Sequence, residues 1–269
     1  MIIKFNCNKI QVNDLILKPS ETYGADIEGV FDFSKENFYA NTVSDGQVLG
    51  YNKNTSKNII LNVFVKKHND IISHLKLNAL LSQPSVTLYL NYDEIGDVEM
   101  KVNLSSKSTS GNYAGAISVD LIAPDPYVYT QESVLLLGVV YANGLKLPMK
   151  MPFKFDSNIA GGIGVLKNIG FVDAFPVIEV TGPSTWFELE NTTTGQKNRI
   201  ELELTENDVL KIDNRPLMLG VYKNGIRQND INLDTWYSCS PGDNVWSFKR
   251  DTPLESTRNC KVTLQSRFI

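Results

Sequence analysis

Most of the chain alternates apolar and polar residues with a period of two. The pattern is clearest in four segments, residues 86–91, 117–122, 200–205 and 262–265. Successive side chains of a β-strand point to opposite faces, so each segment predicts a strand with one buried and one solvated face. This alternation is typical of antiparallel sheets, because parallel sheets are buried on both faces. The predicted fold class is therefore mainly β.

Turn signals separate the predicted strands. Asn224-Gly225 lies between β-forming residues and is the strongest hairpin signal, because a type I′ turn needs a positive φ at two successive residues. Residues 93–97 predict a second hairpin tip, between strands at 88–91 and 98–104. Thr192–Gly195 and residues 240–244 predict two further turns.

One segment shows helical spacing instead. Its apolar residues recur every three to four positions, at Ile71, Ile72, Leu75, Ala79 and Leu80. Asn69 or Asp70 can serve as the N-cap, and Pro84 prevents continuation. The sequence predicts a helix over about residues 69–82, and this is the only substantial helix expected.

The domain boundary is predicted just after Pro124-Asp125-Pro126. Each proline removes a donor from the strand ladder and disfavours helix in the residue before it. At roughly 150 residues per domain, 269 residues predict about two domains. Residues 1–130 are expected to form an N-terminal β domain that carries the helix. Residues 131–269 are expected to supply a linker and a C-terminal β-sandwich, with Gly161–Gly164 interpreted as part of the flexible linker.

Charge and hydropathy exclude several classes of function. The 26 Lys and Arg against 30 Asp and Glu give a net charge of −4, so we expect no nucleic-acid recognition driven by counterion release. No apolar run approaches the roughly 20 residues that span a bilayer, so we expect no membrane insertion. Residues 1–10 lack the continuous apolar stretch of about 7–15 residues that a signal peptide needs, and none is expected.

The reactive residues are few and scattered, so we predict no catalytic residue, metal site or cofactor, and an enzyme is the least favoured class. They comprise two histidines and three cysteines: His68, His74, Cys7, Cys239 and Cys260. They match no zinc spacing, and no GxSxG motif supplies a nucleophile. Whether Cys239 and Cys260 lie close enough to bridge stays open.

Two other groups of residues have a functional and a structural interpretation. Carboxylates around the predicted hairpin tip, Asp93, Glu94, Asp97 and Glu99, are interpreted as solvated charge and not as a metal site. The three tryptophans are interpreted as core residues, or else as a platform for sugars. The second interpretation keeps a monomeric carbohydrate-binding module as the alternative function.

The order of the motifs along the chain is more specific than any one of them. They run through residues 120–127, 166–170, 175–183, 191–195, 207–213, 221–225, 235–236, 240–244 and 262–268. In this order and spacing the chain resembles the distal tail protein (Dit) family of long non-contractile-tailed phages and prophages. The resemblance covers nearly the full length, and residues 176–244 carry most of it.

The resemblance implies a structural protein of the virion tail tip, assembled in the host cytoplasm, without catalysis or cofactor. The N-terminal β-sandwich with its helix would assemble six copies into a ring, and the C-terminal sandwich would be galectin-like. The ring would join the tail tube protein to the tail-associated fibre protein and, in some members, to receptor-binding proteins. Such a hub works through extended surfaces. Ile71 and Leu75 on the helix, with Asp93, Glu94 and Asp97 at the hairpin tip, are the candidate assembly contacts.

Overall fold

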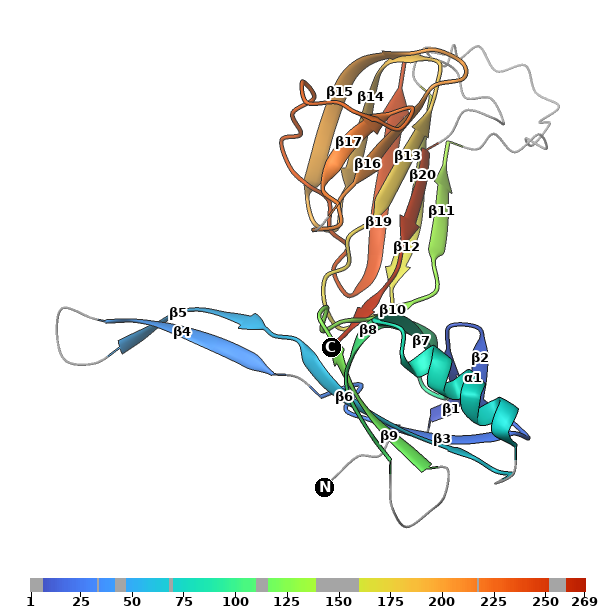
Figure 1. The fold of residues 1–269 in the computed structure, drawn as a ribbon. Helices are drawn as coiled ribbons and strands as arrows, with labels where there is room; N and C mark the ends of the chain where they lie inside the picture. Colours follow the sequence, from blue (N-terminus) through green and yellow to red (C-terminus); the bar gives the residue numbers. More distant parts are fainter. Residues whose placement is uncertain are drawn as a thin grey trace. The chain divides into compact units, whose positions relative to one another are not determined.

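The computed structural model describes residues 7–32, 34–41, 47–67, 70–109, 116–138, 160–216, 218–251 and 260–269. The chain divides into two compact units, Met1–Gln131 with Phe268–Ile269, and Glu132–Arg267. Antiparallel strands build both units, and the described residues contain one α-helix (Figure 1). The mainly β fold class predicted from the sequence is therefore confirmed.

The first unit is organised around one antiparallel sheet. Its path is β2-β1-β7-β8-β9-β6-β3, with β10 pairing to β8 and β21, which contains Phe268, pairing to β10. The strands are β1 (Cys7–Val12), β2 (Leu15–Lys18), β3 (Tyr23–Glu28), β6 (Lys57–Val65), β7 (Ser85–Tyr92), β8 (Gly96–Thr109), β9 (Ala116–Ala123), β10 (Val128–Thr130) and β21 (Arg267–Phe268). Although β2 and β3 stand at opposite ends of this path, they contact each other, so the sheet curves around its core.

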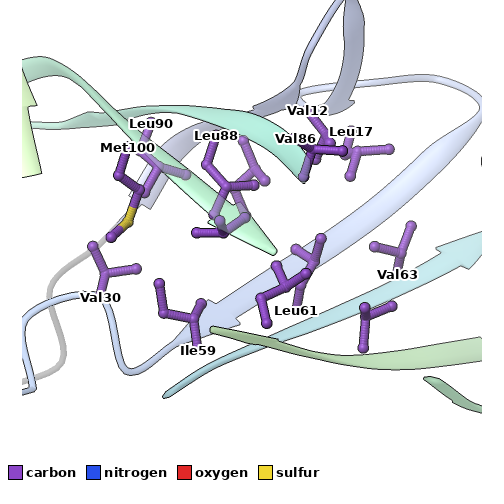
Figure 2. Packing of buried hydrophobic residues seen from close by; sticks show 14 of the residues in the cluster. Val12, Leu17, Val30, Ile59, Leu61, Val63, Val86, Leu88, Leu90 and Met100 are labelled. Carbon is purple, nitrogen blue, oxygen red and sulfur yellow. The ribbon is translucent and has the colours of Figure 1, made fainter. Parts of the chain in front are cut away.

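The alternation seen in the sequence places the core of this unit. In β7, the apolar set Val86, Leu88 and Leu90 is buried, whereas Tyr89 faces outward. Figure 2 shows these three side chains converging with Ile59 and Leu61 and their neighbours. The helix α1 (Ile71–Leu81) adds Leu77 and Leu81 to the same core. Burying each of these leucines stabilises the fold by roughly 1.5–3 kcal/mol.

A two-stranded ribbon completes the first unit. β4 (Lys35–Asn41) and β5 (Gln47–Asn54) pair with each other and with no other described strand. Figure 1 shows the ribbon as an arm apart from the curved sheet. At its root, the Thr55 amide donates to the Ser34 carbonyl oxygen at 2.9 Å, and the Asn54 side chain donates to the Tyr127 hydroxyl at 3.1 Å. The arm is thus tied to the segment that precedes β10.

The second unit is a sandwich of two sheets. One has the order β11-β20-β13-β16-β17-β18, with bounds Ser133–Leu137, Cys260–Leu264, Val177–Thr181, Val209–Asp213, Gly220–Lys223 and Ile226–Arg227. The other has the order β12-β19-β14-β15, with bounds Ala160–Asn168, Gly242–Arg250, Ser184–Asn191 and Gln196–Leu204. Both sheets contribute to one core, for example Ile178 from the first and Phe187 and Phe248 from the second. Its likeness to galectins stays a prediction.

The Asn224-Gly225 hairpin forms as predicted. Both residues have positive φ, 51° and 81°, and Lys223 pairs with Ile226 across the turn. These are the features of a two-residue type I′ turn. The Asn224 side chain also accepts a hydrogen bond from the Val209 amide at 2.9 Å, which ties the turn to β16.

The interpretation of Gly161–Gly164 as flexible linker is wrong. These residues belong to β12, which pairs with β19 from Ala160↔Arg250 to Asn168↔Gly242. A Cβ on Gly162 would lie 2.6 Å from the Gly138 nitrogen, and one on Gly164 would lie 2.7 Å from Leu135 Cδ1. Gly162 is therefore needed where β12 packs closely against the residue that follows β11, whereas Gly164 faces the flexible end of the Leu135 side chain.

Candidate assembly surfaces

The first candidate surface is the outer face of α1. Asp70 caps the helix, because its carboxylate accepts hydrogen bonds from the Ser73 amide at 3.0 Å and the Ser73 hydroxyl at 2.6 Å. Ile71, Ile72 and Leu75 are 70%, 66% and 62% exposed, which is high for apolar residues on a packed helix. We call these three residues the helix patch. Apolar patches of this kind mark interaction sites when they are large and contiguous.

The helix is confirmed, but its buried face differs from the one that the spacing of Ile71, Leu75 and Ala79 suggests. The core takes Leu77 and Leu81, one turn apart on another side of the helix. Apolar residues are spread around this helix, so periodicity alone does not select one face. Packing against the first unit's sheet makes the choice.

The second candidate surface is the hairpin tip between β7 and β8. Asp93 accepts a hydrogen bond from the Asn8 side chain at 2.6 Å, and Asp97 accepts one from Asn91 at 2.8 Å. Glu94 lies exposed in the turn, which Gly96 completes with a φ of 76°. Asp93 and Asp97 are thereby held by β1 and β7, so the tip presents its charges from fixed positions.

The structure places the five predicted contact residues in two separate groups. The helix patch precedes β7, and the hairpin tip follows it. Since a strand rises about 3.4 Å per residue, β7 spans on the order of 25 Å between its ends. Ile71 and Leu75 therefore belong to one surface, and Asp93, Glu94 and Asp97 to another.

A small pocket adjoins the hairpin tip on the outer face of the sheet. It has a volume of about 180 Å³ and is lined by Lys9, Gln11, Tyr89, Leu90, Asp97, Val98, Glu99 and Gln131. Sequence reasoning found Asp97 and Glu99 but not Lys9, Gln11, Tyr89 or Gln131. The sequence could have placed Tyr89 near Glu99, because both face outward and lie on the two strands of one predicted hairpin. It could not have placed Lys9 and Gln11, because the pairing of β1 with β7 is a tertiary feature.

The β4–β5 arm is a third surface that the sequence interpretation missed. One signal was present, the Asp45-Gly46 dipeptide between the two polar segments that form the strands. The segments lack clear apolar alternation, because the arm has no place in the sheet's core. Of its described side chains, Lys53 pairs with Glu36 at 3.3 Å and lies 5.4 Å from the ring centre of Phe38.

In the second unit, the tryptophans do not form an open platform. Trp246 is fully buried, and Trp236 packs partly buried against the core. Trp186 faces outward, but the guanidinium of Arg199 stacks on its ring, 4.1 Å from the centre. A sugar that stacks on this face of the ring would have to displace the guanidinium.

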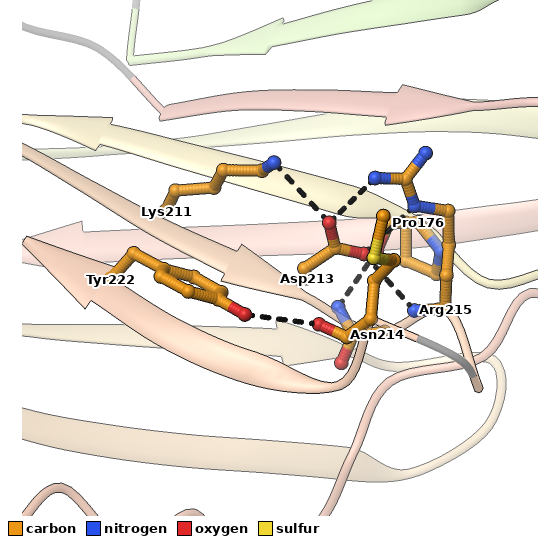
Figure 3. A network of polar contacts seen from close by, with 7 residues as sticks. Pro176, Lys211, Asp213, Asn214, Arg215 and Tyr222 are labelled. Carbon is orange, nitrogen blue, oxygen red and sulfur yellow. Dashed lines mark hydrogen bonds and ion pairs between the residues drawn. The ribbon is translucent and has the colours of Figure 1, made fainter. Parts of the chain in front are cut away.

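The polar contacts of the second unit are structural in character. Figure 3 shows Asp213 between Lys211 and Arg215, with ion-pair distances of 3.2 and 2.6 Å. Next to it, the buried Asn214 side chain donates to the Pro176 carbonyl oxygen at 2.8 Å and accepts from the Tyr237 amide at 2.8 Å. This network fastens the end of β16 to the segment before β13.

The remaining reactive residues form no site in the described part of the chain. Cys7, Cys239 and Cys260 are buried free thiols, so no disulfide joins the last two. Burial raises the pKa of Cys239 to about 12, which keeps this thiol protonated and unreactive. His74 is half-buried on α1, whereas His68 lies outside the described residues. Among those residues, no three His, Cys, Asp or Glu side chains gather as a metal would require.

The described residues contain no helix that is both long and apolar enough to cross a membrane. Their single helix, at 11 residues, is too short to cross a bilayer.

Comparison with known structures identifies the fold. The SPP1 Dit (gp 19.1) protein, described as a paradigm of the hub adsorption apparatus in phages infecting Gram-positive bacteria, matches 97% of this chain and 99% of its own. The TM-score is 0.62 at 12% sequence identity. A chain of the phage P2 baseplate in its activated conformation with Ca also matches, over 96% of this chain and 97% of its own, with a TM-score of 0.47 at 14% identity.

Comparison by sequence, in contrast, finds no relative of this chain. No protein-family model and no curated protein sequence matches this chain. At 12% identity, the match to SPP1 Dit is a likeness of fold. It extends over both units, since it covers nearly all of both chains. The chain thus has a Dit-like fold, as the resemblance in its sequence predicts.

Proposed function

We propose that this chain is a structural hub of a phage tail tip. Six copies would close into a ring that joins the tail tube protein to the tail-associated fibre protein and, at the side, to receptor-binding proteins. The protein would act in the virion after assembly in the host cytoplasm. The observation that carries the proposal is the full-length fold likeness to the SPP1 Dit protein.

The surfaces of the first unit support an assembly role. The helix patch exposes three large aliphatic side chains, and the hairpin tip presents carboxylates held by Asn8 and Asn91. A closed ring requires two different surfaces on each copy, because head-to-tail contacts repeat around the axis. The separation of these two groups fits that requirement. The N-terminal domain, proposed as residues 1–130, carries both.

The alternative, a monomeric carbohydrate-binding module, gains no support from the tryptophans. Trp246 is inaccessible, and Arg199 covers one face of Trp186. Trp236 is partly buried against the core, so the described residues of the second unit offer no group of uncovered tryptophan rings of the kind that the alternative needs. The hub remains the better-supported function.

Particle mass tests the proposal. We expect light scattering coupled to size-exclusion chromatography, at protein concentrations from micromolar to hundreds of micromolar, to detect a species of six chains. Negative-stain images of that fraction should show closed rings. A monomer at every concentration, also when mixed with the neighbouring tail proteins of the same phage, would overturn the hub.

A further inference from the structure

We infer that the pocket beside the hairpin tip docks an arginine side chain of a partner protein other than this chain. This assigns Asp97 to that partner and leaves Asp93 and Glu94 as the candidate ring contacts of the hairpin tip. The inference deepens the proposed function and rests on it, because a neighbouring tail protein would supply the arginine. The pocket lies wholly in the first unit and is built from β1, β7, β8 and Gln131.

The size of the pocket suits one long side chain. Its volume of about 180 Å³ lies below the range of roughly 300–1,000 Å³ of ordinary small-molecule sites. The residues that contribute most of the binding energy of a protein interface are enriched in tryptophan, tyrosine and arginine and fill pockets, so a single side chain of this kind suits a pocket of this size.

The lining favours a planar cation. Asp97 and Glu99 stand two residues apart on β8, so their side chains project from the same face of the sheet. Tyr89 is the register partner of Glu99 on β7 and is 37% exposed, so its ring stands next to a carboxylate. An aromatic ring beside carboxylates attracts a guanidinium both by stacking and by charge.

Asp97 is already oriented to accept such a donor. Its Oδ1 accepts a hydrogen bond from Asn91 at 2.8 Å, and its Oδ2 accepts a longer one from Gln131 at 3.5 Å. A carboxylate oxygen can accept more than one hydrogen bond, so both retain acceptor capacity. The guanidinium offers five donors in a rigid fork, whereas an ammonium offers three from a point charge. Arginine therefore matches the pocket better than lysine.

Lys9 is the only cation among the lining residues and makes no ion pair with any described residue. Its charge opposes that of an incoming guanidinium and leaves the lining with a net charge of −1 from Asp97, Glu99 and Lys9. If arginine binds here, removing the Lys9 charge must strengthen binding. A neutral ligand such as a sugar predicts no such gain.

The probe is N-acetyl-arginine amide, with N-acetyl-citrulline amide as its neutral isostere. Saturation-transfer NMR detects weak ligands on the full chain, whether monomer or ring. We expect the arginine probe to bind with a dissociation constant on the order of millimolar, as befits a ligand of this size. The citrulline probe should bind at least about tenfold more weakly, because it lacks the charge.

Variants locate the binding. Glu99→Gln should weaken arginine binding by about three- to tenfold, and Lys9→Gln should strengthen it by about two- to fivefold. Asp26→Asn is the matched control: Asp26 is an exposed carboxylate on β3, three strands from β8 in the sheet order, and does not line the pocket. It removes the same charge as Glu99→Gln and should leave the affinity unchanged.

The inference would be overturned if both probes bound equally, or if Lys9→Gln bound the arginine probe more weakly than the wild type. It would also be overturned if the monomer bound the arginine probe and the ring did not, because another copy would then fill the pocket. A failure of arginine binding leaves the hub untouched if light scattering still detects six chains. Conversely, if the chain bound arginine but stayed monomeric under all conditions, the pocket inference would stand and the hub proposal would fail.

Discussion

The Nζ of Lys57 donates a hydrogen bond to the carbonyl oxygen of Val30 at 2.9 Å, and Lys57 is only 2% exposed. This contact joins the first residue of β6 to the loop after β3, near the root of the β4–β5 arm. Burial lowers the pKa of Lys57 to about 8, although the charges of Asp32 and Asp125 act to raise it. The folded chain therefore releases this proton at a lower pH than the unfolded chain does.

Lys57 makes the stability of the first unit depend on pH in the alkaline range. Between pH 8 and the ordinary lysine pKa of 10.5, the unfolded state binds a proton that the folded state lacks, so stability rises with pH across this window. Lys57→Met removes this contribution. Urea unfolding at pH 7.5 and 9.5 should show the wild type gaining stability relative to the variant, while other alkaline titrations cancel in the difference. A parallel response of both proteins would contradict the assignment.

Asp213 should contribute in the acid range. Burial raises the pKa of Asp213, but hydrogen bonds from Arg215 and the ion pair with Lys211 outweigh it and hold the pKa below its usual value. Its contribution is present above the unfolded pKa of 3.8 and is lost as pH falls through the folded pKa.

Asp213→Asn should therefore lower the free energy of unfolding of the second unit by about 1–2 kcal/mol at pH 7. The difference from the wild type should be smaller at pH 3, because protonation of the unfolded wild type below its pKa of 3.8 begins to remove this contribution. Thermal unfolding at the two pH values measures it. An unchanged difference would mean that packing, and not charge, accounts for the loss.

The two faces of α1 should respond differently to truncation. Leu77→Ala should destabilise the first unit by about 2–5 kcal/mol, because it leaves a cavity in the core. Leu75→Ala should change stability by less than about 0.5 kcal/mol, since Leu75 is 62% exposed. Chemical denaturation distinguishes the two.

The role of the helix patch in assembly can be tested by particle mass. If Leu75 lies in a contact of the proposed ring, Leu75→Asp should shift the particle mass toward smaller species while circular dichroism stays that of the wild type. Rings of unchanged mass and stability in this variant would remove the helix patch from the candidate contacts.

The glycines of β12 should differ in their tolerance of alanine. In Gly162→Ala the new methyl group meets the backbone nitrogen of Gly138, which cannot move without opening the strand contact. In Gly164→Ala it meets the end of the flexible Leu135 side chain. We expect a loss of about 1–3 kcal/mol for the first and clearly less for the second, by urea unfolding. Equal losses would point to a backbone cause common to both.

The sequence by itself determined the strands with clear alternation, the helix and the tight hairpin of this protein, because each follows from local chemistry. Alternation in 86–91 selects an extended backbone with one buried face. Asp70 and Pro84 bound the helix, and Asn224-Gly225 adopts the positive φ values that its turn needs. The order of such local signals along the chain was enough to indicate the Dit-like fold.

Only the tertiary structure decided which surfaces these elements share. The buried face of α1 falls on Leu77 and Leu81 because the curved sheet lies there, and Phe268 joins the first unit's core from the far end of the chain. Of the four carboxylates around the hairpin tip, Asp97 and Glu99 share a pocket with Lys9, because β1 pairs with β7. Contacts between residues distant in sequence depend on how sheets curve and pair, and no local pattern encodes that.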